Sequence, residues 1–257
     1  MIEPSTLRKA QLIMLDMLVE FDAICKHHNL KYWLDSGSLL GAVRHKGFIP
    51  WDDDIDISMP IEDYQQFIKI APAELSSDIF FQTSQTDKAF KFDYLKLRSN
   101  KANIVEFHEK DKKVNYHQGV FVDIFPMLTI DNTDENKQLY DSALSEIRTV
   151  SAVSLNTQDG IDNPKKRTEL VATLNAHHQG WSGDNLKIIY AGEMPDVAAW
   201  FDYEAVFPLT TLSFEGVEFY VPNNPSDYLN AIYKFDYREL PPEDMRKIHA
   251  HRIEFTV

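Results

Sequence analysis

An acidic run near residue 54 has the residue types and the spacing best suited to chemistry. Within it, Asp54-Ile55-Asp56-Ile57 alternates carboxylates with isoleucines. Successive side chains of a strand point to opposite faces, so Asp54 and Asp56 share one face while the isoleucines anchor the other face in the core. Two neighbouring carboxylates repel each other unless a proton or a cation joins them. The spacing therefore predicts a divalent-metal site, and oxygen ligands of this kind suit Mg²⁺ or Mn²⁺.

A glycine-serine pair upstream complements these acids. Gly37-Ser38 follows a short apolar segment and is expected to form a turn that opens a helix. Backbone N–H groups at a helix N-terminus, where the dipole is positive, bind anions such as phosphate. A phosphate held there, beside a metal held by Asp54 and Asp56, would make the machinery of phosphoryl or nucleotidyl transfer.

The acids taken alone could also have an ordinary role. A pair such as Asp54 and Asp56 is more often part of a solvated surface or a weak calcium loop. Here, however, four acids occupy the five positions 52–56, opposite an apolar face and downstream of the turn. This context favours the metal site over the solvated surface.

A third acid lies further along the chain. Asp123 is the only charged residue in the apolar run 120–125, which is expected to be a strand. An unpaired carboxylate in such a place would cost free energy. We therefore expect Asp123 either to join the other two acids or to be a capping or ion-paired structural group.

The stretch 32–57 resembles the signature of the LicD family of phosphocholine transferases, which includes the fukutin-type phosphotransferases within the nucleotidyltransferase superfamily. Residues 120–126 and 222–249 resemble later motifs of this family, so the resemblance spans about residues 30–250. It implies an α/β (α+β) fold with a polymerase-beta-like nucleotidyltransferase core, a mixed sheet flanked by helices and an additional helical region. The long connection between the turn and the acids is shared with LicD-type sequences.

The resemblance also implies roles for individual residues. Gly37 and Ser38 correspond to the turn that contacts the substrate, and Asp54 and Asp56 to the metal pair. Asp123 corresponds to the third acid, so all three aspartates are expected to be catalytic and to bind metal.

Four basic residues are expected to contact the substrate. Arg44 lies inside the signature, and Lys96 and Arg98 alternate along an expected strand, which puts them on one face. Arginine can clamp phosphate oxygens with two hydrogen bonds. For each of the three, a surface ion pair explains the residue equally well. His249, in the last family-like motif, is expected either to approach the pyrophosphate or to pack the C-terminal helix.

Hydrophobic periodicity and turn residues predict the remaining elements. The expected helices cover residues 6–29, 39–45, 60–70, 136–154, 164–176, 225–233 and 242–251. The expected strands cover residues 31–34, 54–57, 79–82, 90–98, 120–125 and 217–221. We expect one domain over 1–257, with a catalytic core at 1–130, a helical acceptor-side region at 131–200 and the C-terminal family motif at 201–257.

Composition limits the class of protein. The 257 residues are 44% hydrophobic and carry a formal charge of −14, which argues against a nucleic-acid partner. The single cysteine, Cys25, allows no internal disulfide, so a reducing compartment such as the cytoplasm is expected. The most apolar run, 12–19, is too short for a transmembrane segment, and peripheral contact with the inner face of a membrane stays open.

These observations lead to one expected function and two alternatives. The expected protein is a metal-dependent transferase that moves phosphocholine, or a related phospho-head group, from a CDP-activated donor such as CDP-choline to a hydroxyl of a glycan or lipid-linked glycan. CMP leaves, and Asp123 accepts the hydroxyl proton. By resemblance the acceptor is a capsular, teichoic or lipopolysaccharide glycan. The alternatives are an Asp-x-Asp sugar-nucleotide glycosyltransferase and a non-catalytic module that binds metal or nucleotide.

Overall fold

A mixed sheet forms the centre of the computed structural model, which describes residues 2–90, 92–156, 164–182, 184–192, 199–233 and 235–256. The strands of this part of the chain are β1 (Trp33–Leu34), β2 (Asp56–Pro60), β3 (Ile79–Gln82), β4 (Leu95–Glu106), β5 (Gly119–Asp131), β6 (Leu186–Tyr190), β7 (Phe201–Asp202), β8 (Thr210–Phe214), β9 (Val217–Val221) and β10 (Ala250–Phe255). Eight of them join one sheet in the order β1-β2-β5-β4-β10, with β3 paired to β4, β6 to β5 and β7 to β6. β8 and β9 form a separate hairpin.

One pair of strands in this sheet is parallel. β2 and β5 run in the same direction, and the other described pairs are antiparallel. β5 is long enough to serve two neighbourhoods, since its first half lies between β2 and β4 and its second half pairs with β6. The mixed sheet flanked by helices confirms the expected fold class and is consistent with a nucleotidyltransferase-like core.

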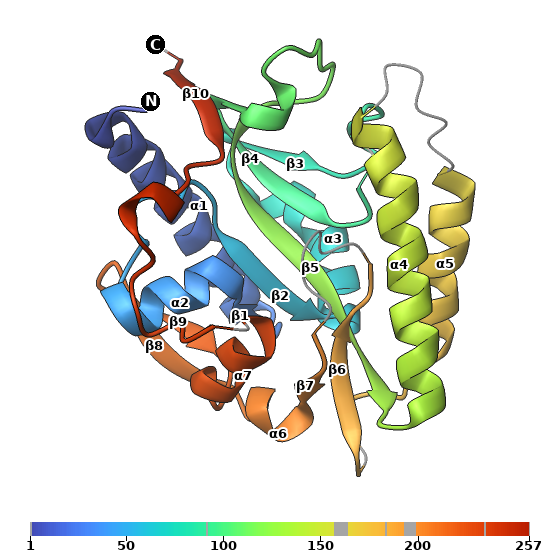
Figure 1. Ribbon diagram of the computed structural model, residues 1–257. Coiled ribbons are helices and arrows are strands. Elements are labelled where there is room, and N and C mark those ends of the chain that lie inside the picture. Colours follow the sequence, from blue (N-terminus) through green and yellow to red (C-terminus); the bar gives the residue numbers. More distant parts are fainter. Residues whose placement is uncertain are drawn as a thin grey trace.

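Helices cover the sheet and its edges. They are α1 (Pro4–His27), α2 (Ser36–His45), α3 (Ile61–Glu74), α4 (Asp134–Asn156), α5 (Pro164–Ala176), α6 (Tyr203–Val206) and α7 (Pro225–Ile232), with short 3₁₀ helices η1 (Phe107–Glu109) and η2 (Glu243–Met245). α1 and α3 pack on the central strands, while α2 lies beside β2 with α7 and the β8–β9 hairpin next to it (Figure 1). None of the described helices combines the length and the apolar character needed to cross a bilayer.

The apolar stripe of α1 explains why this helix packs on the sheet. Met14, Leu18, Phe21 and Cys25 recur every three or four residues and are fully buried. Burial raises the pKa of the Cys25 thiol, which suits a small packed side chain better than a reactive one.

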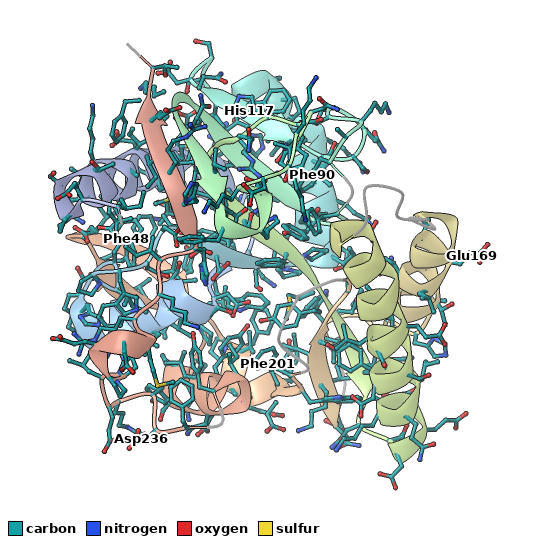
Figure 2. All side chains as sticks on the ribbon, turned by 45° about the horizontal axis from the view of Figure 1, so that its top comes forward. Phe48, Phe90, His117, Glu169, Phe201 and Asp236 are labelled. Atoms are coloured by element: carbon teal, nitrogen blue, oxygen red, sulfur yellow. The ribbon has the colours of Figure 1, made fainter. Side chains whose placement is uncertain are left out.

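The buried apolar side chains of the described residues form two clusters. The larger one lies around the central strands, and Figure 2 shows Phe201 in the interior, where its ring stacks on Tyr228 at 3.9 Å. The smaller one lies where α4 and α5 cover β6 and the far end of β5 (Figure 1). Its members include Leu128, Ile189 and Leu144. In contrast, Figure 2 shows Glu169 of α5 at the periphery.

The expected helix over 242–251 is wrong. Only η2 forms there, and the chain then extends into β10, which pairs antiparallel with β4. The proline pair at 241–242 reads as the start of a helix, but the backbone of the following segment instead satisfies the N–H and C=O groups along the edge of β4.

Other boundaries also differ from expectation. The strand expected over 90–98 begins at Leu95 and continues to Glu106, and the strand expected over 54–57 begins at Asp56. The helix expected over 39–45 begins at Ser36. The region 131–200 contains the two expected helices together with β6, which belongs to the main sheet, and residues 157–163, 183 and 193–198 lie outside the described residues.

Candidate active site

A buried aspartate fixes the start of α2. The Asp35 side chain accepts hydrogen bonds from the Ser36 N–H (2.6 Å), the Ser58 hydroxyl (2.5 Å) and the Tyr190 hydroxyl (2.9 Å). The backbone N–H of Asp35 donates to the Asp56 carbonyl at 3.0 Å. Complete burial raises the pKa of this carboxyl, and the hydrogen bonds that it accepts oppose the shift. Asp35 therefore ties the N-terminus of α2 to the strand that follows the acidic run.

Gly37 and Ser38 lie in the first turn of α2 and contact the acidic run directly. The Ser38 hydroxyl accepts a hydrogen bond from the Asp56 N–H at 2.9 Å, so this serine positions the backbone of Asp56. A Cβ atom on Gly37 would lie 2.8 Å from a carboxylate oxygen of Asp52. The missing side chain thus allows the helix N-terminus and the acids to approach each other closely.

Burial alternates along the acidic run as expected, and the alternation already begins at Asp52, two residues before Asp54. Asp52, Asp54 and Asp56 are half-buried, whereas Asp53 and Ile55 between them are buried. Burial and then the charge of the neighbouring acids raise the pKa of Asp54 and of Asp56 well above the ordinary range. For Asp52 the same causes, burial first, raise the pKa to about 7. These carboxylates share one region and disfavour one another's charge.

Asp123 lies next to Asp56 across the parallel pair of strands. The two residues are partners in the β2–β5 register, and Lys96 is the partner of Asp123 in the β4–β5 register. The Lys96 ammonium lies 2.7 Å from one oxygen of the Asp123 carboxylate and 2.8 Å from the other. Burial raises the pKa of Asp123 even though the charge of Lys96 opposes the shift. Asp123 is therefore ion-paired with Lys96 and also lies beside Asp56, and a role for it in metal binding stays a prediction.

Both arginines that were expected to bind phosphate are engaged within the fold. Arg98 is buried and donates to the Gln82 side chain and to the Gly119 carbonyl, each at 2.8 Å. Arg44 donates to the carbonyls of Tyr237 (2.9 Å) and Glu239 (3.2 Å). Arg98 therefore holds the sheet together, while Arg44 fastens the C-terminal segment to α2, and their contact with a substrate stays a prediction.

His249 reaches the acidic run from the other end of the chain. Its Nδ1 atom lies 3.3 Å from an oxygen of Asp53, which also accepts hydrogen bonds from the backbone N–H groups of His249 (3.2 Å) and Ala250 (2.5 Å). The hydrogen bond to Asp53 raises the pKa of His249 to about 9. His249 does not pack a C-terminal helix, because that segment leads into β10.

The sequence of the segments that build this site is similar to that of known proteins. Residues 29–150, which include α2, the acidic run and Asp123, match the sequence model described as LicD/FKTN/FKRP, nucleotidyltransferase domain. The chain carries a LicD-family domain. This confirms the resemblance expected from the sequence.

Individual relatives agree with this assignment. The chain is 27% identical to the lipopolysaccharide cholinephosphotransferase LicD of Haemophilus influenzae over 95% of its own length and 96% of that protein. It is 35% identical to the human ribitol 5-phosphate transferase FKRP over 29% of its length and 15% of the human protein. An uncharacterized protein of Rickettsia typhi is 29% identical over 71% of this chain and 50% of that protein. The named relatives are phosphotransferases, which confirms the expected class of enzyme.

Sequence reasoning gave no site role to two side chains near the acids of the LicD domain, although Asp52 was one of the four acids and Tyr233 lies in the family-like segment 222–249. Asp52 continues the row of half-buried carboxylates, and the signal was present in the four acids of residues 52–56. Tyr233 follows α7, and its pKa is raised by burial and then by the charges of Asp56 and Asp52. The proximity of Tyr233 to the acids depends on how α7 packs in the fold, so the local sequence does not predict it.

The donor set of the LicD domain fits a divalent cation. In the described part of the chain, neither Asp54 nor Asp56 forms an ion pair with a lysine, arginine or histidine, and both keep some exposure to solvent. Carboxylates close enough to raise each other's pKa are hard oxygen ligands of the kind that Mg²⁺ and Mn²⁺ accept. Asp54 and Asp56 would hold the ion, with Asp123 as the third carboxylate beside them.

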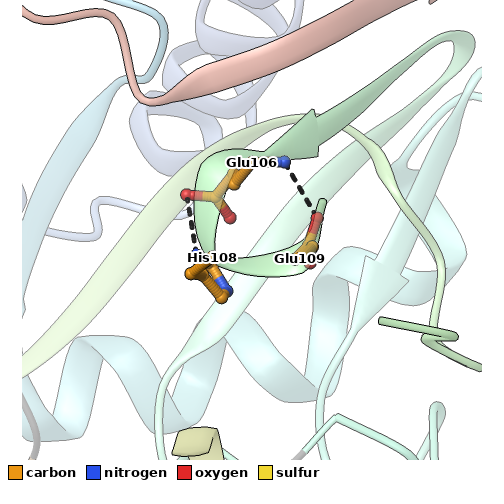
Figure 3. Close-up of side chains that lie close together, drawn as sticks. All are labelled: Glu106, His108 and Glu109. Carbon is orange, nitrogen blue, oxygen red and sulfur yellow. Dashed lines mark hydrogen bonds and ion pairs between the residues drawn. The ribbon is translucent and has the colours of Figure 1, made fainter. Parts of the chain in front are cut away.

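A second group of potential ligands lies on η1, outside this site. Side-chain atoms of Glu106, His108 and Glu109 converge within 4.8 Å of one another (Figure 3). Glu109 is buried and accepts hydrogen bonds from the Glu106 N–H and the Gln118 amide, each at 3.0 Å, and from the Tyr116 hydroxyl. Together with Glu106 it forms a capping box for η1, so the fold itself accounts for the buried carboxylate.

Proposed function

We propose that this LicD-family protein is a metal-dependent transferase that moves phosphocholine, or a related phospho-head group, from a CDP-activated donor to a hydroxyl of a cell-surface glycan precursor, with release of CMP. One observation carries the proposal. Within the described residues, Asp54 and Asp56 form no ion pair with a basic side chain and lie beside the N-terminus of α2, and Asp123 lies opposite Asp56 on the adjacent parallel strand. The named transferases among the relatives support the same class of reaction.

The first turn of α2 would bind the donor phosphate. The N–H groups of Gly37 and Ser38 lie in the first turn, where a helix offers no carbonyl partner and its dipole is positive. Asp35 and Ser38 hold this turn against the backbone of Asp56, so the anion site and the carboxylates keep a fixed relation to one another. Such prepositioning contributes much of the rate enhancement when a transition state is loose.

Mg²⁺ or Mn²⁺ held by Asp54, Asp56 and Asp123 would neutralise charge that develops on the transferred phosphoryl group and the leaving CMP. The protein's own task is to accept the proton of the acceptor hydroxyl. Asp123 can do so, because Lys96 at 2.7 Å favours the charged form of this carboxylate against the effect of burial.

The direct test replaces Asp56 by asparagine and measures CMP release. Purified protein is incubated with Mg²⁺, a glycan precursor and one of several CDP-activated donors that carry choline, ethanolamine or a sugar alcohol. The wild-type protein should release CMP and form a phosphodiester, and the variant should fold normally and lose this activity. Near wild-type transfer by Asp56→Asn would falsify the proposal.

Product analysis separates the alternatives. A glycosyltransferase of the Asp-x-Asp type would use a sugar nucleotide and form a glycosidic bond, so a product without phosphorus would favour it. A non-catalytic module would show a metal-dependent rise in melting temperature and no turnover on any donor.

A further inference from the structure

A groove of about 860 Å³ lies between η1 and the segment that leads into β10. One segment lines it with residues 106–108 and Lys110, the other lines it with residues 246–251, and Ile2 also contributes. It is separate from the first turn of α2, where the donor phosphate is proposed to bind.

The groove is basic in a chain that is acidic overall. Lys110, Arg246, Lys247 and His249 contribute to its lining, and Glu106 is its only acidic lining residue among those described. The whole chain has 40 acidic and 26 basic residues, so this local excess of positive charge runs against the composition. The charge would attract an anion, and the effect is strongest in a concave site.

Two lysines of the groove are free to bind a ligand. Lys110 and Lys247 are exposed, come from segments far apart in the sequence, and form no ion pair with any residue in the described ranges. Two lysines that line one groove from different segments suit an anion such as a phosphate group, which accepts several charge-assisted hydrogen bonds.

The same groove offers an apolar surface. The Phe107 side chain is 60% exposed, and its ring lies 5.3 Å from that of His251. Ile248 lines the groove near them. An exposed aromatic surface beside convergent polar groups is typical of a ligand site. Sugars present C–H faces that pack on such a surface, which an inorganic ion does not do.

The groove meets the acidic run at one end. His249 lies in its lining and contacts Asp53, the residue before Asp54. The guanidinium of Arg246, also in the lining, lies 4.9 Å from the centre of the Trp51 ring. A ligand in the groove therefore lies beside residues 51–53, next to the acidic run.

We propose that this groove binds a phosphate-bearing saccharide and presents its hydroxyl group to the acidic run, so that the groove is the acceptor subsite. Its role as an acceptor subsite rests on the proposed transfer function. The binding of a sugar phosphate does not, because the lysines and the aromatic surface lie outside the carboxylate site.

The experiment measures sugar-phosphate binding in the absence of metal. Glucose 6-phosphate is titrated into the full chain in EDTA, and histidine ring NMR signals report binding at His108, His249 and His251. Glucose is the uncharged control ligand. The wild-type protein should bind glucose 6-phosphate more tightly than glucose, with shifts confined to these groove histidines.

Matched variants locate the site. The double variant Lys110→Gln/Lys247→Gln should weaken glucose 6-phosphate binding about tenfold, the effect of losing roughly 1.4 kcal/mol of charge-assisted contact. Lys69→Gln/Lys137→Gln removes the same charge from two exposed lysines on α3 and α4 and should bind like the wild type. Equal weakening by both pairs, or shifts outside the groove, would overturn the proposal.

Two more measurements separate the groove from the carboxylate site and a saccharide from a lipid. Asp56→Asn should keep glucose 6-phosphate binding while it loses transfer, so that failure of the acceptor subsite and failure of the proposed reaction give different results. Vesicles of phosphatidylcholine with phosphatidylglycerol test a lipid headgroup as the source of phosphate. If Lys110 and Lys247 governed vesicle binding while glucose 6-phosphate did not bind, the saccharide proposal would be wrong.

Discussion

The protein contains two groups of carboxylates whose surroundings differ. On η1, the buried Glu109 receives hydrogen bonds from a tyrosine hydroxyl, a glutamine amide and a backbone N–H. In the acidic run, Asp54 and Asp56 are half-buried and form no ion pair with a basic residue of the described chain. The first group is complete within the fold, and the second lacks the positive charge that would balance it.

The difference lies in what the protein holds in place. In the acidic run, hydrogen bonds fix the backbone: the Asp56 N–H donates to Ser38, and the Asp56 carbonyl accepts from Asp35. The carboxylates themselves are left to repel one another, which costs stability. A fold that positions a costly arrangement so firmly indicates a functional site, while a carboxylate with its own donors indicates a structural one.

Removal of one carboxylate from the acidic run should have the largest effect on activity. We expect Asp56→Asn to lower CMP release by about 10²- to 10³-fold, as loss of a charge-stabilising group does in other enzymes. Its melting temperature should equal or exceed that of the wild type, because one repelling charge is gone. The matched change on η1, Glu109→Gln, should keep transfer within a few-fold of wild type. If Glu109→Gln abolished transfer and Asp56→Asn did not, Glu109 would have the functional role that we assign to Asp56, and the comparison would be wrong.

Metal binding should depend on the carboxylates of the acidic run and not on Glu109. Mn²⁺ at about 100 times its dissociation constant should stabilise the wild-type protein by roughly 2.7 kcal/mol, because the ion binds the folded state. Asp54→Asn should lose most of this gain, measured as the shift in thermal unfolding with and without EDTA. Glu109→Gln should retain it. If Asp54→Asn kept the full metal-dependent shift in thermal unfolding, the ion would bind elsewhere. The group on η1 would then be the next candidate site.

The η1 carboxylate should matter for stability. Glu109→Gln replaces an acceptor oxygen by an amide donor that faces the Tyr116 hydroxyl and other donors, so it should lower the free energy of unfolding by about 1–3 kcal/mol. Urea denaturation measures the change. His108→Gln on the same turn is the control, since His108 is exposed and outside the hydrogen bonds of Glu109, and it should change stability by less than about 0.5 kcal/mol. Equal losses in both variants would contradict the capping role.

Local patterns were enough to predict the acidic face and the turn beside it. Alternation predicted that Asp54 and Asp56 share a face, and the Gly37-Ser38 turn predicted a helix start close by, although α2 begins three residues before the expected Leu39. The LicD resemblance added the fold class, which the sheet and the family match confirm. These features depend on residues that are close in sequence.

Contacts between distant segments could not be predicted in this way. The pairing of Asp56 with Asp123 requires the parallel register of β2 and β5, and Arg98 finds Gln82 and Gly119 only after three strands assemble. The expected helix over 242–251 failed for the same reason, because the edge of β4 supplies backbone partners that the local sequence does not reveal.

Glu215, a carboxylate outside both groups, extends the comparison and has the smallest expected effect. It pairs with Arg8 at 2.6 Å and accepts a hydrogen bond from the Phe48 N–H at 3.1 Å, so it connects the β8–β9 turn to α1 and to the loop after α2. Like Glu109, it has its own donors, but it lies nearer the surface. We therefore expect a structural role with a smaller energy, about 0.2–1 kcal/mol for the ion pair.

The pKa shift of Glu215 predicts how its contribution to stability should change with pH. The hydrogen bond from Arg8 is the largest cause that lowers the pKa of Glu215 below its usual 4.5. The folded protein thus binds this proton less readily than the unfolded chain, so the stabilisation is present above pH 4.5 and is lost as the pH falls through the folded pKa. The wild type should exceed Glu215→Gln in unfolding free energy at pH 7, and the difference should shrink in acid. A difference independent of pH would mean that Glu215 acts through packing and not through its charge. The distinction between carboxylates that have their own donors and carboxylates that lack a basic partner would then not apply at the surface.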